Sequence, residues 1–264
     1  MQRKVGHYVI VLLLAAVLIA AAGAVLLFIA PGDPIALAYK LNTAWKLAAS
    51  LGCFLAAAAF GRGDYLRYAW GAFGLSYAAL EVRDVLLVLD VLGTDFFSLN
   101  LSQIVCNTAG VVGFILFARA FRAGGLELPG GLALKAAVYV GAVALAVALS
   151  AVALVDHVGR LGQGTDAVGA IASDLGDLAG FALIAPIFLT ALALRGGALA
   201  WPWFILVAAQ VTWIIYDVIA YTAPLPLKEV TRCLACLLTG VAGLAQRRVL
   251  AVPAEHSRAA RSKA

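Results

Sequence analysis

The chain has 264 residues, of which 64% are hydrophobic and only 12% are charged. Soluble domains carry about 45–50% apolar and about 25% charged residues, so this composition excludes an ordinary soluble domain and predicts an all-α integral membrane protein. The net charge of +5 comes from cations beside apolar segments. These cations indicate topology signals and contacts with membrane lipids, and they argue against nucleic-acid binding.

A helix needs about 20 apolar residues to cross a bilayer, and eight segments of this kind follow one another. We expect transmembrane helices over residues 8–30, 37–60, 68–92, 101–120, 134–155, 167–194, 201–223 and 228–246. Short stretches rich in helix breakers separate them, such as Pro31-Gly32-Asp33-Pro34 and Gly124-Gly125. The first segment follows Arg3 and Lys4 but is longer than a signal-peptide core, so we retain it as a helix.

The distribution of cations predicts the orientation of these helices. One set of connecting and terminal segments holds most of them: Arg3, Lys4, Arg62, Arg67, Arg119, Arg122, Arg195, Arg247, Arg248, Arg258, Arg261 and Lys263. The alternate set holds chiefly Lys40, Arg160 and Lys228. Cytoplasmic loops carry the excess of Lys and Arg. We therefore expect a multi-pass protein of the cell's inner (cytoplasmic) membrane with both termini cytoplasmic, which requires an even number of helices.

An internal repeat is visible at a spacing of about 130 residues, the size of a four-helix half. The aligned pairs are Arg62 and Arg195, Trp70 and Trp203, Asp84 and Asp217, Cys106 and Cys236, Gly110 and Gly240, and Gly113 and Gly243. We predict a tandem 4+4 parallel repeat, with halves over residues 1–125 and 126–248. A basic cytoplasmic tail would follow over residues 249–264.

Polar side chains gather at one depth in the expected bundle. At about 1.5 Å per residue, Lys46, Asp84, Asp217 and Arg232 lie about 21–24 Å above the cytoplasmic ends of their helices. Charges at such depth are costly and mark functional or paired residues. Helical spacing adds neighbours on the same faces. The candidate ligand-binding residues are Lys46, Tyr77, Glu81, Asp84, Gln103, Gln210, Trp213, Asp217 and Arg232.

These charges allow more than one interpretation. Lys46 would pair with Glu81 or Asp84, and Arg232 with Asp217, which would fix helix register as polar side chains do between membrane helices. The same residues would alternatively form a ligand, ion or catalytic site. Spacing also places Asp174 beside Asp177 and Glu229 beside Arg232, three residues apart in each case.

The sequence predicts no metal site and no cofactor, and it assigns no catalytic residue. Cys233 and Cys236 form a CxxC, but a structural zinc site needs two more ligands, and no second CxxC or nearby histidine supplies them. The three histidines lie near helix ends or in the tail, where they do not suit haem ligation. No nucleotide-binding loop, GxSxG elbow or HExxH motif occurs.

Two helices carry a resemblance to a known class. A basic residue, Trp70, an apolar run and Asp84 are repeated as Arg195, Trp203 and Asp217. This pattern resembles the multi-pass N-terminal membrane regions of bacterial diguanylate cyclases and sensor kinases. The resemblance implies a sensor-like module that binds a small or lipid-derived ligand in an outer-side polar cavity. Because this sequence has no output domain, we expect it to act through a separate cytoplasmic signalling partner.

Two alternative functions stay open. Bacterial lysoplasmalogenases, which also have eight helices, are similar in carrying a lysine on helix two, an Asp late in helix three and a Ser-Asp on helix six; here these are Lys46, Asp84 and Ser173-Asp174. That resemblance implies an intramembrane lipid hydrolase. Carboxylates among Glu81, Asp84, Asp174, Asp177 and Asp217 would then activate water. Leu47 follows the lysine where a proline is typical of that family, and Arg83 precedes the Asp where a glycine is typical. The third hypothesis is a small-molecule transporter, since parallel repeats with charges inside the membrane occur there.

Overall fold

The computed structural model describes residues 2–29, 32–89, 96–162, 166–219 and 222–261. Within these ranges the chain forms eight helices and no strand. The helices are α1 (Gln2–Ile29), α2 (Pro34–Ala57), α3 (Tyr65–Val88), α4 (Phe96–Ala123), α5 (Leu132–Gly159), α6 (Asp166–Ala193), α7 (Ala200–Ile219) and α8 (Leu225–Arg261). The all-helical class and the eight predicted helices are therefore confirmed.

The observed helix ends differ most from the predicted ones at the two ends of the chain. Helix α1 begins at Gln2 instead of residue 8, and α8 continues to Arg261 instead of ending at residue 246. The predicted tail over residues 249–264 thus begins inside α8. Side chains beyond Ala251 lie outside the described residues, so the separate role of that tail stays a prediction.

Local sequence signals explain where α2 and α3 begin. Asp33 and Asp64 both have extended backbone conformations, and their carboxylates accept hydrogen bonds from the backbone N–H of Ile35 and Leu66 at 2.8 Å. Such side chains satisfy amide groups that have no partner within the first helical turn. Pro34 occupies the first turn of α2, where its missing N–H costs nothing. Two aspartates in short loops thus fix the starts of the helices that carry the buried Lys46 and Asp84.

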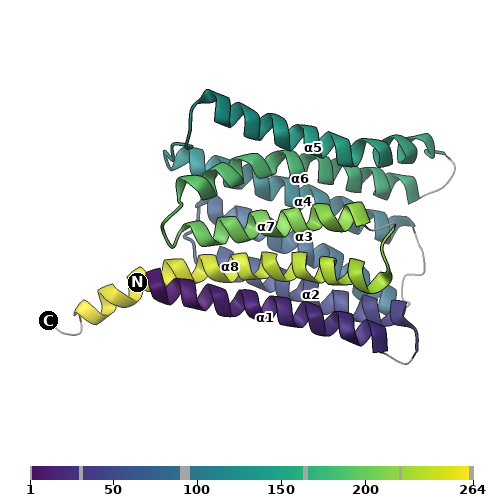
Figure 1. Cartoon of the computed structure of the whole chain (residues 1–264), viewed down its shortest axis with the longest axis horizontal. Coiled ribbons are helices and arrows are strands. Elements are labelled where there is room, and N and C mark those ends of the chain that lie inside the picture. Colours follow the sequence, from purple (N-terminus) through teal and green to yellow (C-terminus); the bar gives the residue numbers. More distant parts are fainter. Residues whose placement is uncertain (1, 30–31, 90–95, 163–165, 220–221, 262–264) are drawn as a thin grey trace.

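Six of the helices form a closed ring of neighbours. In order around the ring, α2 contacts α3, α3 contacts α4, α4 contacts α6, α6 contacts α7, α7 contacts α8, and α8 returns to α2. Helix α1 packs outside the ring on α8, and α5 packs outside it on α6. Figure 1 shows the eight helices lying side by side along one direction, with α5 and α1 at opposite edges and both termini at the same end. The ring defines an interior that the site occupies.

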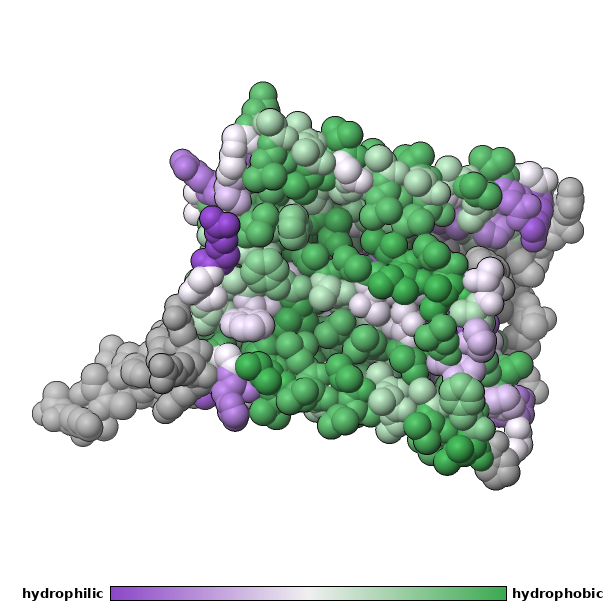
Figure 2. All heavy atoms as spheres, viewed as in Figure 1, coloured by the Kyte–Doolittle hydropathy of each residue, from purple (hydrophilic) through white to green (hydrophobic). Residues whose placement is uncertain are grey.

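The surface between the two ends of the bundle is apolar. Figure 2 shows hydrophobic residues covering the middle of the visible face and hydrophilic residues at both ends. Six helices are long and apolar enough to cross a membrane, namely α1, α4, α5, α6, α7 and α8. Helices α2 and α3, with 24 residues each, do not belong to this apolar set. The chain therefore has the architecture expected of a multi-pass membrane protein.

Glycine lets α2 and α8 approach closely. A Cβ atom built on Gly52 would lie 2.4 Å from the carbonyl oxygen of Gly240, and one built on Gly243 would lie 2.3 Å from the carbonyl oxygen of Gly52. Small residues permit such backbone contact between membrane helices, where packing is a main source of association. This contact holds the first and last ring helices together.

Candidate functional site

A cavity of about 300 Å³ lies inside the ring, and every ring helix contributes to its wall. Each helix contributes at least one polar or aromatic side chain to this wall, for example Lys46 on α2, Tyr77 on α3, Gln103 on α4, Asp177 on α6, Trp213 on α7 and Arg232 on α8. The lining mixes charged, amide, hydroxyl and aromatic side chains. A concave space with a few convergent polar groups is the usual form of a small-molecule site.

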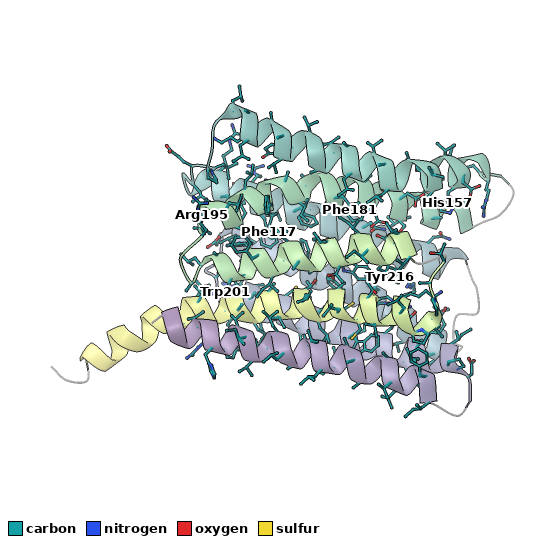
Figure 3. The ribbon with its side chains drawn as sticks, viewed as in Figure 1. Phe117, His157, Phe181, Arg195, Trp201 and Tyr216 are labelled. Carbon is teal, nitrogen blue, oxygen red and sulfur yellow. The ribbon has the colours of Figure 1, made fainter. Side chains whose placement is uncertain are left out.

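A second cavity of about 480 Å³ adjoins the first and reaches α5. The two share seven lining residues, which are Arg83, Gln103, Ser173, Asp177, Phe181, Tyr216 and Asp217. The second cavity adds Asp174 and His157, whose Nδ1 lies 2.7 Å from Asp174 Oδ2. Figure 3 shows Tyr216 and His157 towards the end of the bundle away from the termini, whereas Phe117 lies nearer the termini. The polar space thus occupies one half of the bundle.

A continuous polar chain joins four ring helices along one wall. Lys46 Nζ binds Asp84 Oδ2, and both side chains are almost completely buried. Arg83 donates to Asp84 Oδ1 from Nε at 3.2 Å and from Nη2 at 3.1 Å. Arg83 Nη1 also donates to Gln103 Oε1 at 2.8 Å, and Gln103 Nε2 donates to Ser173 Oγ at 3.0 Å. One carboxylate therefore serves two cations, and the amide of Gln103 extends the chain to α6.

A second polar cluster connects α2, α7 and α8. Glu229 accepts a hydrogen bond from Asn42 Nδ2 at 2.8 Å and also binds Arg232, one turn further along α8. The guanidinium carbon of Arg232 lies 5.2 Å from the ring centroid of Tyr216, within the range of a cation–π contact. Glu229 and Asn42 are both buried. The charge of Arg232 is therefore matched inside the protein.

The tyrosine hydroxyl of Tyr77 links three helices at the wall of the first cavity. Trp213 Nε1 on α7 donates to the Tyr77 hydroxyl at 2.7 Å, and the same hydroxyl is 2.9 Å from Thr239 Oγ1 on α8. The Thr239 hydroxyl itself donates to the Ala235 carbonyl oxygen, so Tyr77 donates to Thr239. These bonds satisfy polar groups that would be costly if left unpaired in an apolar interior.

Asp177 and Asp217 differ from the carboxylates in those clusters. Both line both cavities, yet neither makes an ion pair or a hydrogen bond with any described residue. Gln210 lies on the same face of α7 as Asp217 and also lines the first cavity. It is 8% exposed and has no hydrogen-bond partner in the described part of the chain. Gln210 is buried, and Asp177 and Asp217 are half-buried. Polar groups inside a protein normally have partners, so these three side chains are free to bind something else.

Aromatic side chains fill the ring interior on the side towards the termini. Trp70, Phe117 and Trp203 are almost fully buried, and Phe73 and Phe121 extend the same cluster. Neighbouring ring centroids lie 4.8–5.9 Å apart in the pairs Phe73–Phe114, Trp70–Phe117 and Trp70–Trp203. Phe73 and Phe114 also line the first cavity. The aromatic cluster therefore forms the floor of the polar space.

The structure brings most of the predicted site residues together. Lys46, Tyr77, Gln103, Gln210, Trp213, Asp217 and Arg232 all line the first cavity. Asp84 lies behind the wall as the partner of Lys46, which was one of the two expected pairings for that lysine. Glu81 lines neither cavity and is partly exposed. The expected pairing of Arg232 with Asp217 is wrong, because Arg232 binds Glu229 on its own helix.

Several residues of the site were not predicted. Arg83 lies at the centre of the polar chain. The sequence did contain a signal for it, because an arginine within an expected membrane helix is unusual and marks a functional or paired residue. Asn42 precedes Lys46 by one turn and so shares its helix face. Asp177 and Tyr216 line both cavities. Asp177 was expected only as one of the carboxylates of the hydrolase alternative, and nothing in the sequence separated Tyr216 from other aromatic residues.

The fold and the cavity define a helical membrane bundle with a polar internal site. Within the described residues, no group of three or more His, Cys, Asp or Glu side chains is arranged to hold a metal ion. Comparisons with family models, with curated proteins and with solved structures give no match for this chain. Function must therefore be argued from the site alone.

Proposed function

We propose that this protein is a sensor-like membrane module that binds a small or lipid-derived ligand in the ring cavity and acts through partner proteins. The observation that carries the proposal is the pair of adjoining cavities, into which Asp177, Asp217 and Gln210 present polar groups without protein partners. Unpaired polar groups in a preformed cavity favour binding over a purely structural role, because a structural network would satisfy its own members.

The proposal includes the placement of the chain in the membrane. We propose that all eight helices cross the bilayer, with both termini in the cytoplasm of a bacterial cell and the cavity towards the outer side. Two observations support this placement. Both termini lie at the same end of the bundle (Figure 1), and Arg195, a cation of the kind that marks cytoplasmic loops, lies at that end too (Figure 3). Helices α2 and α3 would be shielded from lipid on their charged faces by the ring, where charged residues in membrane bundles are normally found.

The proposed tandem repeat is supported by the ring. If every helix number is raised by four, with counting resumed at α1 after α8, each ring contact becomes another ring contact. The contact of α2 with α3 becomes that of α6 with α7, and the contact of α4 with α6 becomes that of α8 with α2. Helices α1 and α5 do not follow this rule, because α1 packs on α8 whereas α5 packs on α6. We propose a duplicated ring with divergent outer helices, which suits a receptor whose ligand lies between two halves.

The test is the identification of what the protein carries from its native membrane. The protein would be purified in mild detergent, extracted with organic solvent, and the extract compared by mass spectrometry with that of an unrelated helical membrane protein prepared in the same way. The proposal predicts one compound class enriched at about one molecule per chain, together with a co-purifying signalling protein. Recovery of bulk lipids alone, at the ratios of the control protein, would contradict it.

A lipid hydrolase is the second candidate, and one observation favours it. His157 and Asp174 form a hydrogen-bonded pair in the second cavity, close to the free carboxylates, and such a pair is a common general base for activating water. If the chain is a hydrolase, the purified protein releases a head group or an aldehyde from ester- or ether-lysolipids, and Asp174→Asn abolishes the release. A transporter is less well supported, because the aromatic cluster fills the interior below the cavity.

A further inference from the structure

The charges inside the ring narrow the chemistry of the ligand, because each of the three cations already contacts a carboxylate of the protein. Lys46 and Arg83 both bind Asp84, and Arg232 binds Glu229 while its guanidinium lies over the Tyr216 ring. An anionic ligand would have to compete with these internal carboxylates. Breaking a buried pair leaves an uncompensated charge, which is strongly unfavourable.

The carboxylates on the opposite wall have no such match. Asp177 on α6 and Asp217 on α7 line both cavities without an ion pair or hydrogen bond among the described residues. The nearest other carboxylate, Asp174, is held by His157. Negative charge removed from bulk water is stabilised by a cation or by hydrogen-bond donors. This wall therefore favours a ligand that brings a positive charge.

Gln210 points independently to a ligand in the same space. Its side chain is 8% exposed, lines the first cavity and has no hydrogen-bond partner in the described chain. Gln210 precedes Asp217 by two helical turns, so both side chains lie on the same face of α7. The amide atoms of Gln210 are reachable from the cavity instead of being sealed in its wall, so a ligand beside them can accept or donate a hydrogen bond.

Aromatic groups complete the wall between Gln210 and Asp217. Trp213 lies one turn from each of them on α7 and lines the first cavity, while Tyr216 lines both cavities. Aromatic faces attract ammonium groups within about 6 Å, and they do so most strongly when water is excluded. Carboxylates beside aromatic rings are the combination that recognises organic ammonium ions rather than metal ions, which prefer several oxygen ligands.

We propose that the cavity binds an organic ammonium ion, a primary or quaternary amine, with Asp177 and Asp217 as counter-charges, Gln210 as hydrogen-bond partner and Trp213 as the aromatic wall. This inference rests on the proposed function, since it names the ligand class of the same site. A cavity of about 300 Å³ accommodates either a free amine or the head group of an amine-bearing lysolipid. The ammonium group is the chemistry common to both sources.

Binding to the full-length protein in detergent tests the inference. The probes are choline, ethanolamine, lysophosphatidylcholine and lysophosphatidylethanolamine, with lysophosphatidylglycerol as the anionic lipid and 3,3-dimethylbutanol as the uncharged isostere of choline. We expect saturable binding of one or both kinds of amine and none of the uncharged isostere. Binding by free choline or ethanolamine would identify a soluble ligand, and binding by the amine lysolipids alone would identify a lipid.

Variants separate recognition of the charge from general effects on folding. Asp177→Asn and Asp217→Asn should each weaken amine binding about tenfold to a hundredfold, as expected for loss of a hydrogen-bonded charge partner. Gln210→Leu should weaken it about tenfold or less. Asp156→Asn changes an exposed carboxylate that binds Arg160 outside both cavities, so it should bind as the wild type does. Asp217→Glu keeps the charge and should bind more tightly than Asp217→Asn.

Two failures are distinguishable. If the anionic lysolipid or the uncharged isostere binds as tightly as the amines, or if both Asn variants bind amines as the wild type does, the ammonium inference is wrong while a ligand site remains. If the protein carries no enriched compound from its native membrane and none of the probes binds, both the inference and the proposed function are wrong. Size-exclusion profiles and helical content, measured for each variant, identify any variant that fails to fold.

Discussion

Trp70 and Trp203 pack against each other in the ring interior, with ring centroids 5.9 Å apart and 30° between the ring planes. They lie on α3 and α7, at equivalent positions of the proposed repeat. Contact between a residue and its repeat equivalent is expected near an axis that relates two halves. The aspartates that follow them have diverged: Asp84 binds Lys46 and Arg83, whereas Asp217 has no ion pair with any residue that the structure describes. One half of the bundle thus holds a matched charge, and the other offers a free one.

The proposed eight-span topology makes a direct prediction for reporter fusions. Fusions after Asp33, Leu89 and Gly162 should report an external location, because these residues follow an odd number of helices. Fusions after Gly63, Gly125 and Gly196 should report a cytoplasmic location. The pair Asp33 and Gly63 tests whether α2 crosses the membrane, and the pair Gly63 and Leu89 tests α3. If both fusions of a pair report the same side of the membrane, the helix between them does not cross it.

The buried pair of Lys46 and Asp84 should stabilise the fold chiefly through mutual compensation. Asp84→Asn leaves the buried Lys46 without its carboxylate and should lower the free energy of unfolding by about 3–5 kcal/mol. Lys46→Met should cost less, because Asp84 keeps its ion pair with Arg83. The double variant should recover much of that loss. The measurement is unfolding by a denaturing detergent in mixed micelles.

An exposed pair on α5 provides the matched control for that measurement. Asp156 and Arg160 are one turn apart and each more than half exposed, so Asp156→Asn should change stability by no more than about 1 kcal/mol. Strictly additive losses for Lys46→Met and Asp84→Asn would show that the two side chains do not stabilise each other.

The close approach of α2 and α8 predicts a strong effect of single methyl groups. Gly52→Ala and Gly243→Ala would each place a Cβ within 2.4 Å of backbone atoms on the facing helix, so the helices must separate and stability should fall by about 1–3 kcal/mol. Gly141→Ala on α5 has no atom within 4 Å of the new Cβ and should be neutral or slightly stabilising. Thermal unfolding in detergent compares the three variants, and equal midpoints would refute the close contact.

The Tyr77 hydroxyl should contribute to stability because it serves both Trp213 and Thr239. Tyr77→Phe removes one acceptor and one donor, which leaves the indole N–H of Trp213 without its partner and should cost about 1–3 kcal/mol. Tyr139→Phe on α5 is the control, since Tyr139 is 39% exposed and its hydroxyl bonds to no described residue. If both variants unfold at the wild-type temperature, water replaces Tyr77 as partner and the cavity wall is open there.

The sequence predicted the helices and the polar layer well, because both depend on local properties. Long apolar runs determine the helices, and depth along a helix follows from its rise per residue. Lys46 and Asp84 could be matched because they are opposite charges at one depth. The same logic failed for Arg232, which has two carboxylates at suitable positions, Glu229 and Asp217. Only the rotation of α7 against α8 decides between them, and sequence spacing does not contain that rotation.

The ring and its two cavities could not be predicted for a related reason. Which helices become neighbours depends on packing, such as the glycine contact between Gly52 and Gly243. Two apolar helices of similar composition, α1 and α5, pack on different partners in the two halves. Gln210 and Asp217 were recognised as one polar face, but that they lack protein partners follows only from the three-dimensional arrangement.

The central claim is that a ligand occupies the ring cavity, and native mass spectrometry of a cavity-filling variant tests it most directly. Gly180 lines the first cavity, and a new Cβ there would meet only Phe114, at 3.6 Å, so Gly180→Leu should fill space without breaking the wall. Gly141→Leu adds the same side chain to the outer face of α5, where nothing lies within 4 Å. The account predicts that the wild type and Gly141→Leu retain one non-covalently bound molecule per chain, which Gly180→Leu loses while staying folded. An empty wild-type protein, or the same bound mass in all three, would contradict it.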